Sequence, residues 1–442
     1  MKNRIYILCL ILTSLSIGCE DVVEGLNDDP NNFTDTNLSL ILNHSLLNVA
    51  SIAEADPARF TTIFTDQFTG FDRQYGTLNG YSVTSADFDD HWEDFYQRGI
   101  TQTQIAKQKA IDAGNTISEG QALILEGYYF AEAALLFGDV PFSEANNVDE
   151  FPDPAYENQI TVINGSIDLI TEGISKAGTS PAANNVFSTT STWGQIGNAL
   201  LARYYLALKD YPLANSAAKA ANFTSNENDW AIQHSGANYG ENLFWQFEVE
   251  QRGDYLKVAG DGDFSYMLEM LDIDHPNYKG NAKTTEAGRY AYYASGESLN
   301  TTDGFAAQTA SFPVTSFEEV QLIIAETEIL ANTDNDAAIA ALNLVRANNV
   351  IRFGGTYDDY VAADFADTDA LHIEILKEKF CLVIGLPTFH DINRTNNMIG
   401  TTIKNENQTT IPQRFPYPST EAASNDNAPE IVDFFQPTQI NQ

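Results

Sequence analysis

The sequence predicts a mostly α-helical protein, in which tetratricopeptide-like helix pairs carry long irregular loops. Apolar residues recur at steps of three and four in several segments, and this spacing places them on one face of a helix. Gly and Pro residues follow these segments closely and end them. Between them lie stretches rich in Asn, Gly, Tyr and Asp that carry little helical periodicity.

The first residues have the order of a signal peptide. Lys2 and Arg4 precede the uncharged run Ile5–Ile17, and Gly18 and Cys19 follow it. Export requires a basic start, a short apolar segment and a small residue at the cleavage site. The run is shorter than the roughly 20 residues that span a bilayer. We therefore expect residues 1–18 to be removed and not kept as an anchor.

The cleavage region resembles a bacterial lipobox, in which the cysteine is lipidated and becomes the first residue. We expect Cys19 to carry lipid and residues 19–36 to form an acidic tether. The acidic pair Glu20-Asp21 resembles the surface-export signal of Bacteroidetes lipoproteins. Acyl chains hold a protein on a membrane without a spanning helix. The alternative is an ordinary secretory signal with a chance cysteine.

The composition is globular and strongly acidic. The chain has 442 residues, of which 43% are hydrophobic, and a formal net charge of -38 at pH 7. Removal of residues 1–18 deletes Lys2 and Arg4 and no acidic residue, so the charge becomes -40 (-38 minus 2). Proteins that bind nucleic acid displace counterions with Lys and Arg. We therefore exclude nucleic acid as a partner.

The cysteine count excludes a disulfide framework. Cys9 leaves with the signal peptide and Cys19 is the lipidation site, so Cys381 stands alone. It lies in the apolar stretch Phe380–Ile384. A lone cysteine in such a stretch is typical of a small core residue and not of a catalytic thiol.

One single helix and one helix pair are predicted from spacing. Gln121–Phe137 is helical and Gly138 ends it. Thr192–Leu208 repeats the pattern, and Pro212 opens the next helix because the N–H that proline lacks would be unpaired there. These last two helices fit half of a tetratricopeptide repeat. The matching residues are Trp193, Ile196, Gly197 and Leu200 in the first helix, and Ala214, Ala218 and Ala221 in the second.

Three more helices are predicted in the C-terminal half. Ser316 and Glu319 have capping-box spacing, in which each side chain binds an otherwise unpaired N–H. Asp336 is expected to cap the partner helix. A third helix runs from Asp369 to Ile384, and Gly385 and Pro387 end it.

The irregular stretches are predicted to carry the function. Residues 222–315 form a loop insertion within a single domain, residues 37–442, and residues 401–442 are similarly irregular. Long loops without periodicity inside a compact domain are more often functional than idle.

The motifs of common enzymes and metal sites are absent. There is no H-E-x-x-H, G-x-S-x-G or P-loop, and no His lies at metal-ligand spacing from another His or Cys. Asp261 and Asp263 begin like a calcium loop, but Tyr266 stands where the turn requires Gly, and Asp272 where Glu is expected. A glycosidase needs two nearby carboxylates, yet the sequence singles out no pair. We expect no catalysis, no cofactor and no metal.

Aromatic and amide residues suggest a sugar-binding surface. Sugars stack their C–H faces on flat rings, and their hydroxyls pair with amides and carboxylates. Gly70–Gly80 has three glycines and no helical stripe, so we expect exposed rings there. Alternation at Phe244–Phe247 predicts a short strand, whereas Trp92, Phe95 and Tyr96 have helical spacing and are expected in the core. The candidate ligand-binding residues are Gln67, Phe71, Asp72, Gln74, Tyr75, Tyr81, Trp230, Trp245, Tyr290 and Tyr292.

Five short motifs occur in a fixed order along the chain. They are Leu26–Asn32, Leu136–Phe142, Leu342–Arg346, Phe389–Thr395 and Arg414–Glu421. Together with the lipobox they resemble the SusD/RagB family of nutrient-binding outer-membrane lipoproteins, closest to its SusD-like branch. Two places depart from the family pattern. His275 and Asn277 flank Pro276 where the family often has D-P-R, and Asn393 replaces one of two arginines.

The resemblance implies a right-handed scaffold of tetratricopeptide-like pairs whose loops form the ligand face. It implies a cell-surface protein, held on the outer membrane by its lipid alone, that acts as a lid on a SusC-type TonB-dependent transporter. Such proteins capture glycans, or sometimes peptides, for import. Three alternatives remain: a peptide ligand at the same location, an interaction scaffold that uses the helical face, and a hydrolase.

Overall fold

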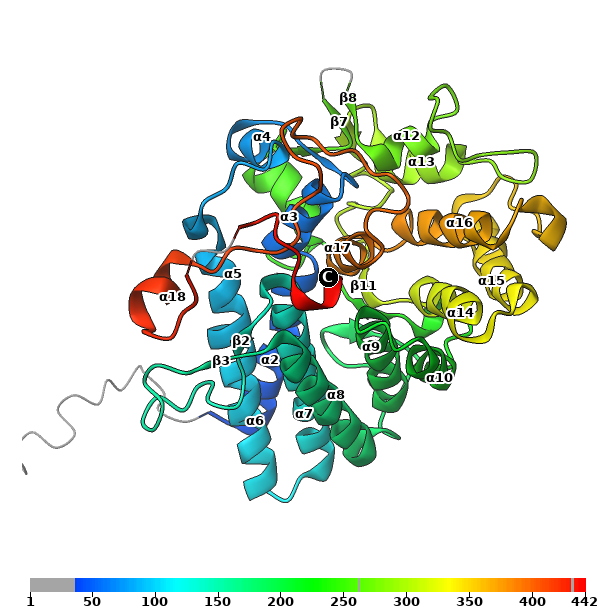
Figure 1. Cartoon of the computed structure of the whole chain (residues 1–442). Coiled ribbons are helices and arrows are strands. Elements are labelled where there is room, and N and C mark those ends of the chain that lie inside the picture. The colour runs from blue at the N-terminus through cyan, green and yellow to red at the C-terminus, as the bar shows by residue number, and fades with distance from the viewer. Residues whose placement is uncertain (1–35, 261–262, 431–432) are drawn as a thin grey trace, which may run out of the picture.

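The computed structural model describes residues 36–260, 263–430 and 433–442. The predicted signal peptide, Cys19 and nearly all of the tether lie outside the described residues. Figure 1 shows a body built largely of helices, with short strands dispersed among the loops. The predicted mostly α-helical class is confirmed.

The elements follow in chain order. The helices are α2 (Leu38–Ala53), α3 (Asp56–Phe64), α4 (Arg73–Asn79), η1 (Ser85–Phe88), α5 (Asp89–Glu93), η2 (Asp94–Ile100), α6 (Thr101–Asp112), α7 (Thr116–Phe137), α8 (Gln159–Ala177), α9 (Trp193–Ala207), α10 (Tyr211–Ala221), η3 (Asn226–Asn228), α11 (Leu243–Trp245), η4 (Gln246–Gln251), α12 (Tyr266–Leu271), α13 (Ala287–Tyr293), α14 (Phe317–Asn332), α15 (Asn335–Phe353), η5 (Ala362–Asp364), α16 (Thr368–Phe380), α17 (Leu386–Arg394), α18 (Ser419–Ser424) and η6 (Gln439–Asn441). The strands are β1 (Thr69–Gly70), β2 (Val140–Pro141), β3 (Tyr156–Glu157), β4 (Phe187–Ser188), β5 (Trp230–Ile232), β6 (Leu256–Lys257), β7 (Ala259–Gly260), β8 (Asp263–Phe264), β9 (Ala294–Ser295), β10 (Ser298–Leu299) and β11 (Phe312–Thr315).

Consecutive helices pack as pairs, as the tetratricopeptide-like pattern predicts. α7 packs on α8, α9 on α10, and α14 on α15, and the pairs contact one another through α8–α9 and α10–α14 (Figure 1). Glycines allow the closest approach. A Cβ added to Gly127 of α7 would lie 2.7 Å from the carbonyl oxygen of Ser166 in α8. A larger side chain there would therefore push the two helices apart.

Several predicted helix ends are confirmed. α7 ends at Phe137, directly before Gly138, whose φ is 89°. Thr192 caps α9, and Asp210 caps α10 with Pro212 in its first turn. These signals are local, so the sequence around each helix end was enough to predict them.

Other predicted ends differ from the structure. Ser316 caps α14, but the Glu319 carboxylate binds Arg203 and does not complete the capping box. Asp334, and not Asp336, caps α15. Gly385 is the residue before α17, so it begins a helix, with proline in the first turn.

The insertion at residues 222–315 is more ordered than predicted. It contains α11, η4, α12, α13 and strands β5 to β11. The predicted strand at Phe244–Phe247 is wrong. The Asn242 side chain accepts hydrogen bonds from the N–H groups of Phe244 and Trp245, and this cap starts a helix at Leu243.

The two predicted ligand segments are joined by strand pairing. β1 pairs with β6, with Thr69 opposite Lys257, and the sheet continues through β10 to β9. Between Gly70 and Gly80 the chain forms α4 and not the predicted loop. Asp72 caps this helix by accepting from the Arg73 N–H. The insertion and the N-terminal segment therefore lie side by side.

One large core holds the body together. It includes buried residues from Ile41 to Ile440, and a smaller cluster lies among α14, α15 and α16. Trp92 and Phe95 are buried, as predicted. Cys381 is also buried with a free thiol, and burial raises its pKa to about 12. None of the helices in the described ranges has the length and apolar character needed to cross a membrane.

Candidate functional site

An open cleft of about 620 Å³ lies between α3, α4, α5 and η4. The first three of these helices are the blue segments at the upper left of Figure 1. The volume falls within the range of about 300–1,000 Å³ that is typical of ligand sites. The lining residues are Asp56, Arg59, Phe60, Gln74, Tyr75, Ala86, Asp87, Asp90, His91, Phe247, Glu250, Gln251 and Arg252.

A hydrogen-bonded group of three residues forms one wall of the cleft. Arg59 Nη2 donates to Asp56 Oδ1 at 2.5 Å, and the Tyr75 hydroxyl donates to the same oxygen at 3.1 Å. Arg59 Nε lies 3.1 Å from the Tyr75 oxygen. Burial opposes ionisation of Asp56, but the charge and hydrogen bonds of Arg59 outweigh it, so the Asp56 pKa is lowered. The wall therefore presents a fixed carboxylate.

Aromatic rings hold this wall rigid. The Tyr75 ring stacks on Phe247 with centroids 5.1 Å apart, and the Arg59 guanidinium lies 4.2 Å from the Phe247 centroid. Tyr75 is only 2% exposed, and its burial raises the pKa of the hydroxyl. Tyr75 therefore stays protonated and acts as a structural donor.

His91 lies beside this group and is buried. Its ring packs edge-on against Phe60 at 4.7 Å and Phe88 at 5.4 Å. Burial lowers its pKa to about 4, although the nearby Asp56 charge opposes this shift. The Nδ1 atom has no hydrogen-bond partner. At neutral pH the cleft thus contains a neutral imidazole, so Arg59 and Arg252 supply its positive charge.

The rim of the cleft is polar and exposed. It consists of Gln74, Asp87, Asp90, Glu250, Gln251 and Arg252. Amides and guanidinium groups donate hydrogen bonds and carboxylates accept them, so the rim can satisfy both functions of a hydroxyl group. This arrangement suits a ligand with many hydroxyls. Across residues 36–260, 263–430 and 433–442, no three His, Cys, Asp or Glu residues cluster as a metal site would require.

A comparison with protein families identifies the chain. Residues 30–347 match the model of a SusD-like family, which is described as starch-binding and associating with the outer membrane. The chain belongs to this SusD-like family. The match covers most of the chain and includes every residue that lines the cleft. No curated protein matches the sequence.

Solved structures of SusD-like proteins share the fold. A SusD/RagB family protein of Bacteroides thetaiotaomicron is 17% identical, with a TM-score of 0.67 over 92% of this chain and 99% of that one. A SusD homolog of Bacteroides fragilis is 15% identical, with a TM-score of 0.69 over 92% and 100%. A structure described as a chitin-binding protein is 15% identical, with a TM-score of 0.64 over 92% and 100%.

The SusD-like body brings two of the predicted residues, Gln74 and Tyr75, to the cleft. The expectation of exposed rings between Gly70 and Gly80 was nevertheless wrong for Tyr75, whose ring is buried against Phe247. Asp72 is exposed at the start of α4. Phe71 is half-buried, and its ring is covered because Lys257 Nζ lies 4.1 Å from the ring centroid. Gly260 also packs against Phe71, since an added Cβ would come within 2.3 Å of the ring.

Gln67, Tyr81 and Trp230 were predicted to contact ligand, but all three are buried. The Gln67 amide is fully buried and donates to the carbonyl oxygens of Phe380 at 2.8 Å and Val383 at 2.9 Å, near the end of α16. The Tyr81 hydroxyl accepts from the backbone N–H of Lys404. Trp230 stacks on Phe187 at 4.2 Å inside the core. These buried contacts stabilise the fold.

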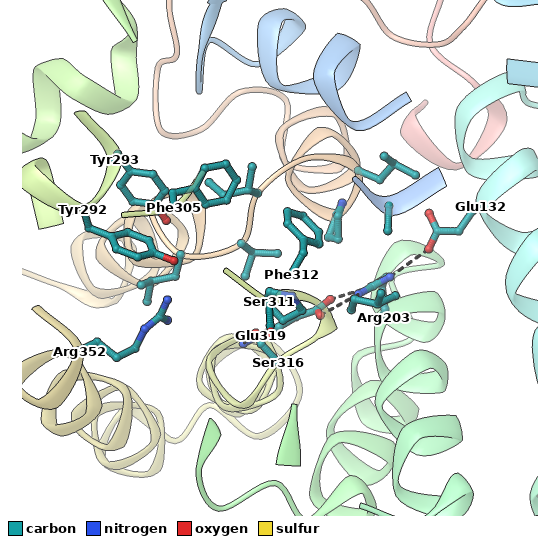
Figure 2. Close-up of a pocket in the computed structure, with 18 of the residues that line it drawn as sticks. Glu132, Arg203, Tyr292, Tyr293, Phe305, Ser311, Phe312, Ser316, Glu319 and Arg352 are labelled. Carbon is teal, nitrogen blue, oxygen red and sulfur yellow. Dashed lines mark hydrogen bonds and ion pairs between the residues drawn. The ribbon is translucent and has the colours of Figure 1, made fainter. Parts of the chain in front are cut away.

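The remaining predicted rings lie elsewhere. Trp245 and Tyr290 are half-buried and do not line the cleft. They also do not line a second, smaller pocket, which Figure 2 shows. Tyr292 lines that second pocket together with Tyr293 and Phe305 (Figure 2). The second pocket has a volume of about 40 Å³. That is room for a few water molecules and much less than a sugar-binding site requires.

Charged residues that form buried ion pairs line the second pocket. Figure 2 shows Arg203 between Glu132 and Glu319, at 3.1 and 2.7 Å. Arg352 enters from the opposite side, and its guanidinium lies 5.7 Å from the Tyr292 centroid. The charges are paired within the protein, so we interpret this pocket as structural.

Several cleft residues were missed by the sequence analysis. Asp56 and Arg59 have the i, i+3 spacing of a helical ion pair, which was a usable signal. His91 and Arg252 gave none, because only the fold brings them to α4. Phe247 was noted only as part of a predicted strand. Tyr239 was also missed, although it is 86% exposed in an Asn- and Gly-rich turn. The criterion used for the other aromatic residues, a ring in a glycine-containing stretch without helical periodicity, would have selected Tyr239.

Proposed function

We propose that this protein captures oligosaccharides at the cell surface and passes them to a SusC-type, TonB-dependent transporter in the outer membrane. The open cleft with a polar rim and a rigid aromatic wall is the observation that supports this function. The family description, starch-binding and associating with the outer membrane, agrees with it. Cys19 would carry the lipid anchor.

The mechanism we propose is capture and local concentration. The rim residues Gln74, Gln251 and Arg252 would bind ligand hydroxyls, and Asp56 would accept from a hydroxyl at the wall. A tethered binder raises the effective ligand concentration near its partner, so modest affinity is sufficient. Tyr239, the exposed ring, is a further candidate for stacking on sugar.

We propose that the cleft binds its ligand without catalysis. Glycosidases use one carboxylic acid with a raised pKa and a second carboxylate beside it. Asp56 has a lowered pKa, and the Oδ1 atom already accepts from Arg59 and Tyr75. This carboxylate is therefore occupied and poorly suited to donate a proton.

Affinity gels test the binding proposal. The purified protein should be retarded in native gels that contain starch or soluble chitin oligosaccharides. Gln74→Ala and Arg252→Ala should reduce the retardation, whereas Gln108→Ala, an exposed glutamine on α6, should not. Equal retardation of all variants would reject the cleft as the site. Binding to a peptide array and to no glycan would favour the peptide alternative.

Two further measurements test the rest of the proposal. Incubation with the bound polysaccharide should release no reducing ends, and any turnover would contradict a purely binding role. Detergent extracts of the cell envelope should contain the protein together with a TonB-dependent transporter. If it purifies alone at low salt and under mild detergent, the delivery role is rejected.

A further inference from the structure

A second open cleft lies beside the first and has a different chemical character. Its volume is about 400 Å³, again within the range of about 300–1,000 Å³ of ligand sites. Its lining contains no charged side chain. The lining residues are Tyr81, Val83, Thr84, Ser85, Pro416, Phe434 and Phe435. We call this the apolar cleft and the first one the polar cleft.

The apolar cleft is held open by buried contacts. Tyr81 and Phe434 are 5% and 8% exposed and form its base. Phe435 is half-buried, and its centroid lies 6.0 Å from Tyr81 and 5.2 Å from Phe434. The Phe435 N–H donates to Asp433 Oδ1 at 3.0 Å. Part of the Phe435 ring is thus presented to solvent in a fixed position.

The two clefts are separated by one short segment. Val83, Thr84 and Ser85 line the apolar cleft, whereas Ala86 and Asp87 line the polar cleft. Ser85 and Ala86 are neighbours in the chain, so their Cα atoms are about 3.8 Å apart. Asp87 Oδ2 accepts from the Thr84 N–H at 2.7 Å and from its hydroxyl at 2.9 Å, and these bonds fix the segment.

We propose that a single extended oligosaccharide occupies both clefts and crosses the segment from Val83 to Asp87. Its hydroxyls bind the rim of the polar cleft, and the C–H face of a further sugar unit packs on Phe435. Pyranose rings offer both kinds of surface, whereas an anionic chain would find no positive charge in the apolar cleft. The inference rests on the proposed function and adds that the ligand is a long, uncharged chain.

Calorimetry with a series of chain lengths tests the inference. The intact protein is titrated with starch-derived or chitin-derived oligosaccharides from the disaccharide to the octasaccharide. Affinity should rise once the chain is long enough to reach Phe435. In Phe435→Ala the affinity should no longer rise with chain length. Long chains should therefore bind this variant about tenfold more weakly than they bind the wild type. Short chains should bind as in the wild type.

Two controls keep the test decisive. Phe365→Ala removes a half-buried phenylalanine elsewhere and should leave the rise intact. If Phe435→Ala melts early, Ser85→Trp is used instead, because the large side chain fills the apolar cleft and should also abolish the rise. The two-cleft inference is overturned if the wild type binds chains of every length with equal affinity. It is also overturned if affinity still rises with chain length in both Phe435→Ala and Ser85→Trp. The proposed function stands in either case. Absence of glycan binding at any length overturns both.

Discussion

Arg203 of α9 and Glu319 of α14 form a bidentate ion pair in the interior, with Nε–Oε1 at 2.7 Å and Nη2–Oε2 at 2.8 Å. Glu132 of α7 contacts the same guanidinium at 3.1 Å. Three helices that are far apart in the sequence therefore share one buried positive charge. The pair also explains why the capping box predicted at Ser316 is only half formed: the Glu319 carboxylate binds Arg203.

Arg203→Met should destabilise the fold strongly. Removing one partner of a buried ion pair leaves an uncompensated charge and costs about 3–5 kcal/mol. Urea unfolding measures this loss. Arg73→Met is the matched control, because Arg73 pairs with Asp72 and their side chains are 74% and 51% exposed, and an exposed pair contributes about 1 kcal/mol or less. Equal midpoints for Arg203→Met and the wild type would show that this charge does not hold the helices together.

Glu248 should make stability fall as pH rises. Burial raises its pKa to about 8, although Arg59 and the Leu256 N–H oppose this shift. In the unfolded chain the group ionises near its ordinary pKa of 4.5. Between these values the unfolded chain loses a proton that the folded protein keeps, so the free energy of unfolding decreases with pH.

Glu248→Gln should remove this dependence. The amide keeps an oxygen to accept from the Leu256 N–H and has no proton to lose. Urea unfolding from pH 5 to pH 9 should therefore show the variant gaining stability relative to the wild type as pH rises, with the gain levelling off above about pH 8, where Glu248 is ionised in the folded protein as well. Parallel curves for the two proteins across this range would contradict the raised pKa.

The helices were predictable from the sequence because their signals are local. The spacing in Gln121–Phe137 and the proline at position 212 each act within a few residues, and the structure follows them. α4 was missed for a related reason. Its seven residues are too few to show an apolar stripe, and the Asp72 cap that starts it lies within a glycine-rich stretch.

The site was predictable only in part, because distant segments meet there. Gln74 reaches the cleft on α4, but Phe247 and Arg252 arrive through the pairing of β1 with β6. The prediction for Gln67 was wrong because a distant segment covers its side chain. Its amide was expected at the surface, yet it binds carbonyl groups more than three hundred residues away. No periodicity in the sequence reports such a contact.

Cys19→Ser should release the protein from the membrane. The lipobox predicts that this cysteine carries the acyl chains that hold the body on the membrane. Cells grown with labelled palmitate should incorporate label into the wild type and not into the variant. The variant should also appear in the soluble fraction after lysis. Cys381→Ser is the control and should keep both the label and the membrane location. Labelling of Cys19→Ser would reject the lipidation site.

Tyr75 should affect stability mainly through its ring and binding mainly through its hydroxyl. Tyr75→Ala removes a buried ring that packs on Phe247, so we expect a loss of about 3–5 kcal/mol in unfolding experiments. Tyr75→Phe keeps the ring but removes the hydrogen bonds that the hydroxyl donates to Asp56 and accepts from Arg59 Nε, and the loss of these bonds to charged groups should cost about 1.5–3 kcal/mol. Its glycan retardation should nevertheless fall, because the Asp56 carboxylate at the wall of the cleft is then less firmly held. If Tyr75→Phe binds glycan as the wild type does, while Gln74→Ala does not, the ligand contacts the rim of the cleft and not its wall.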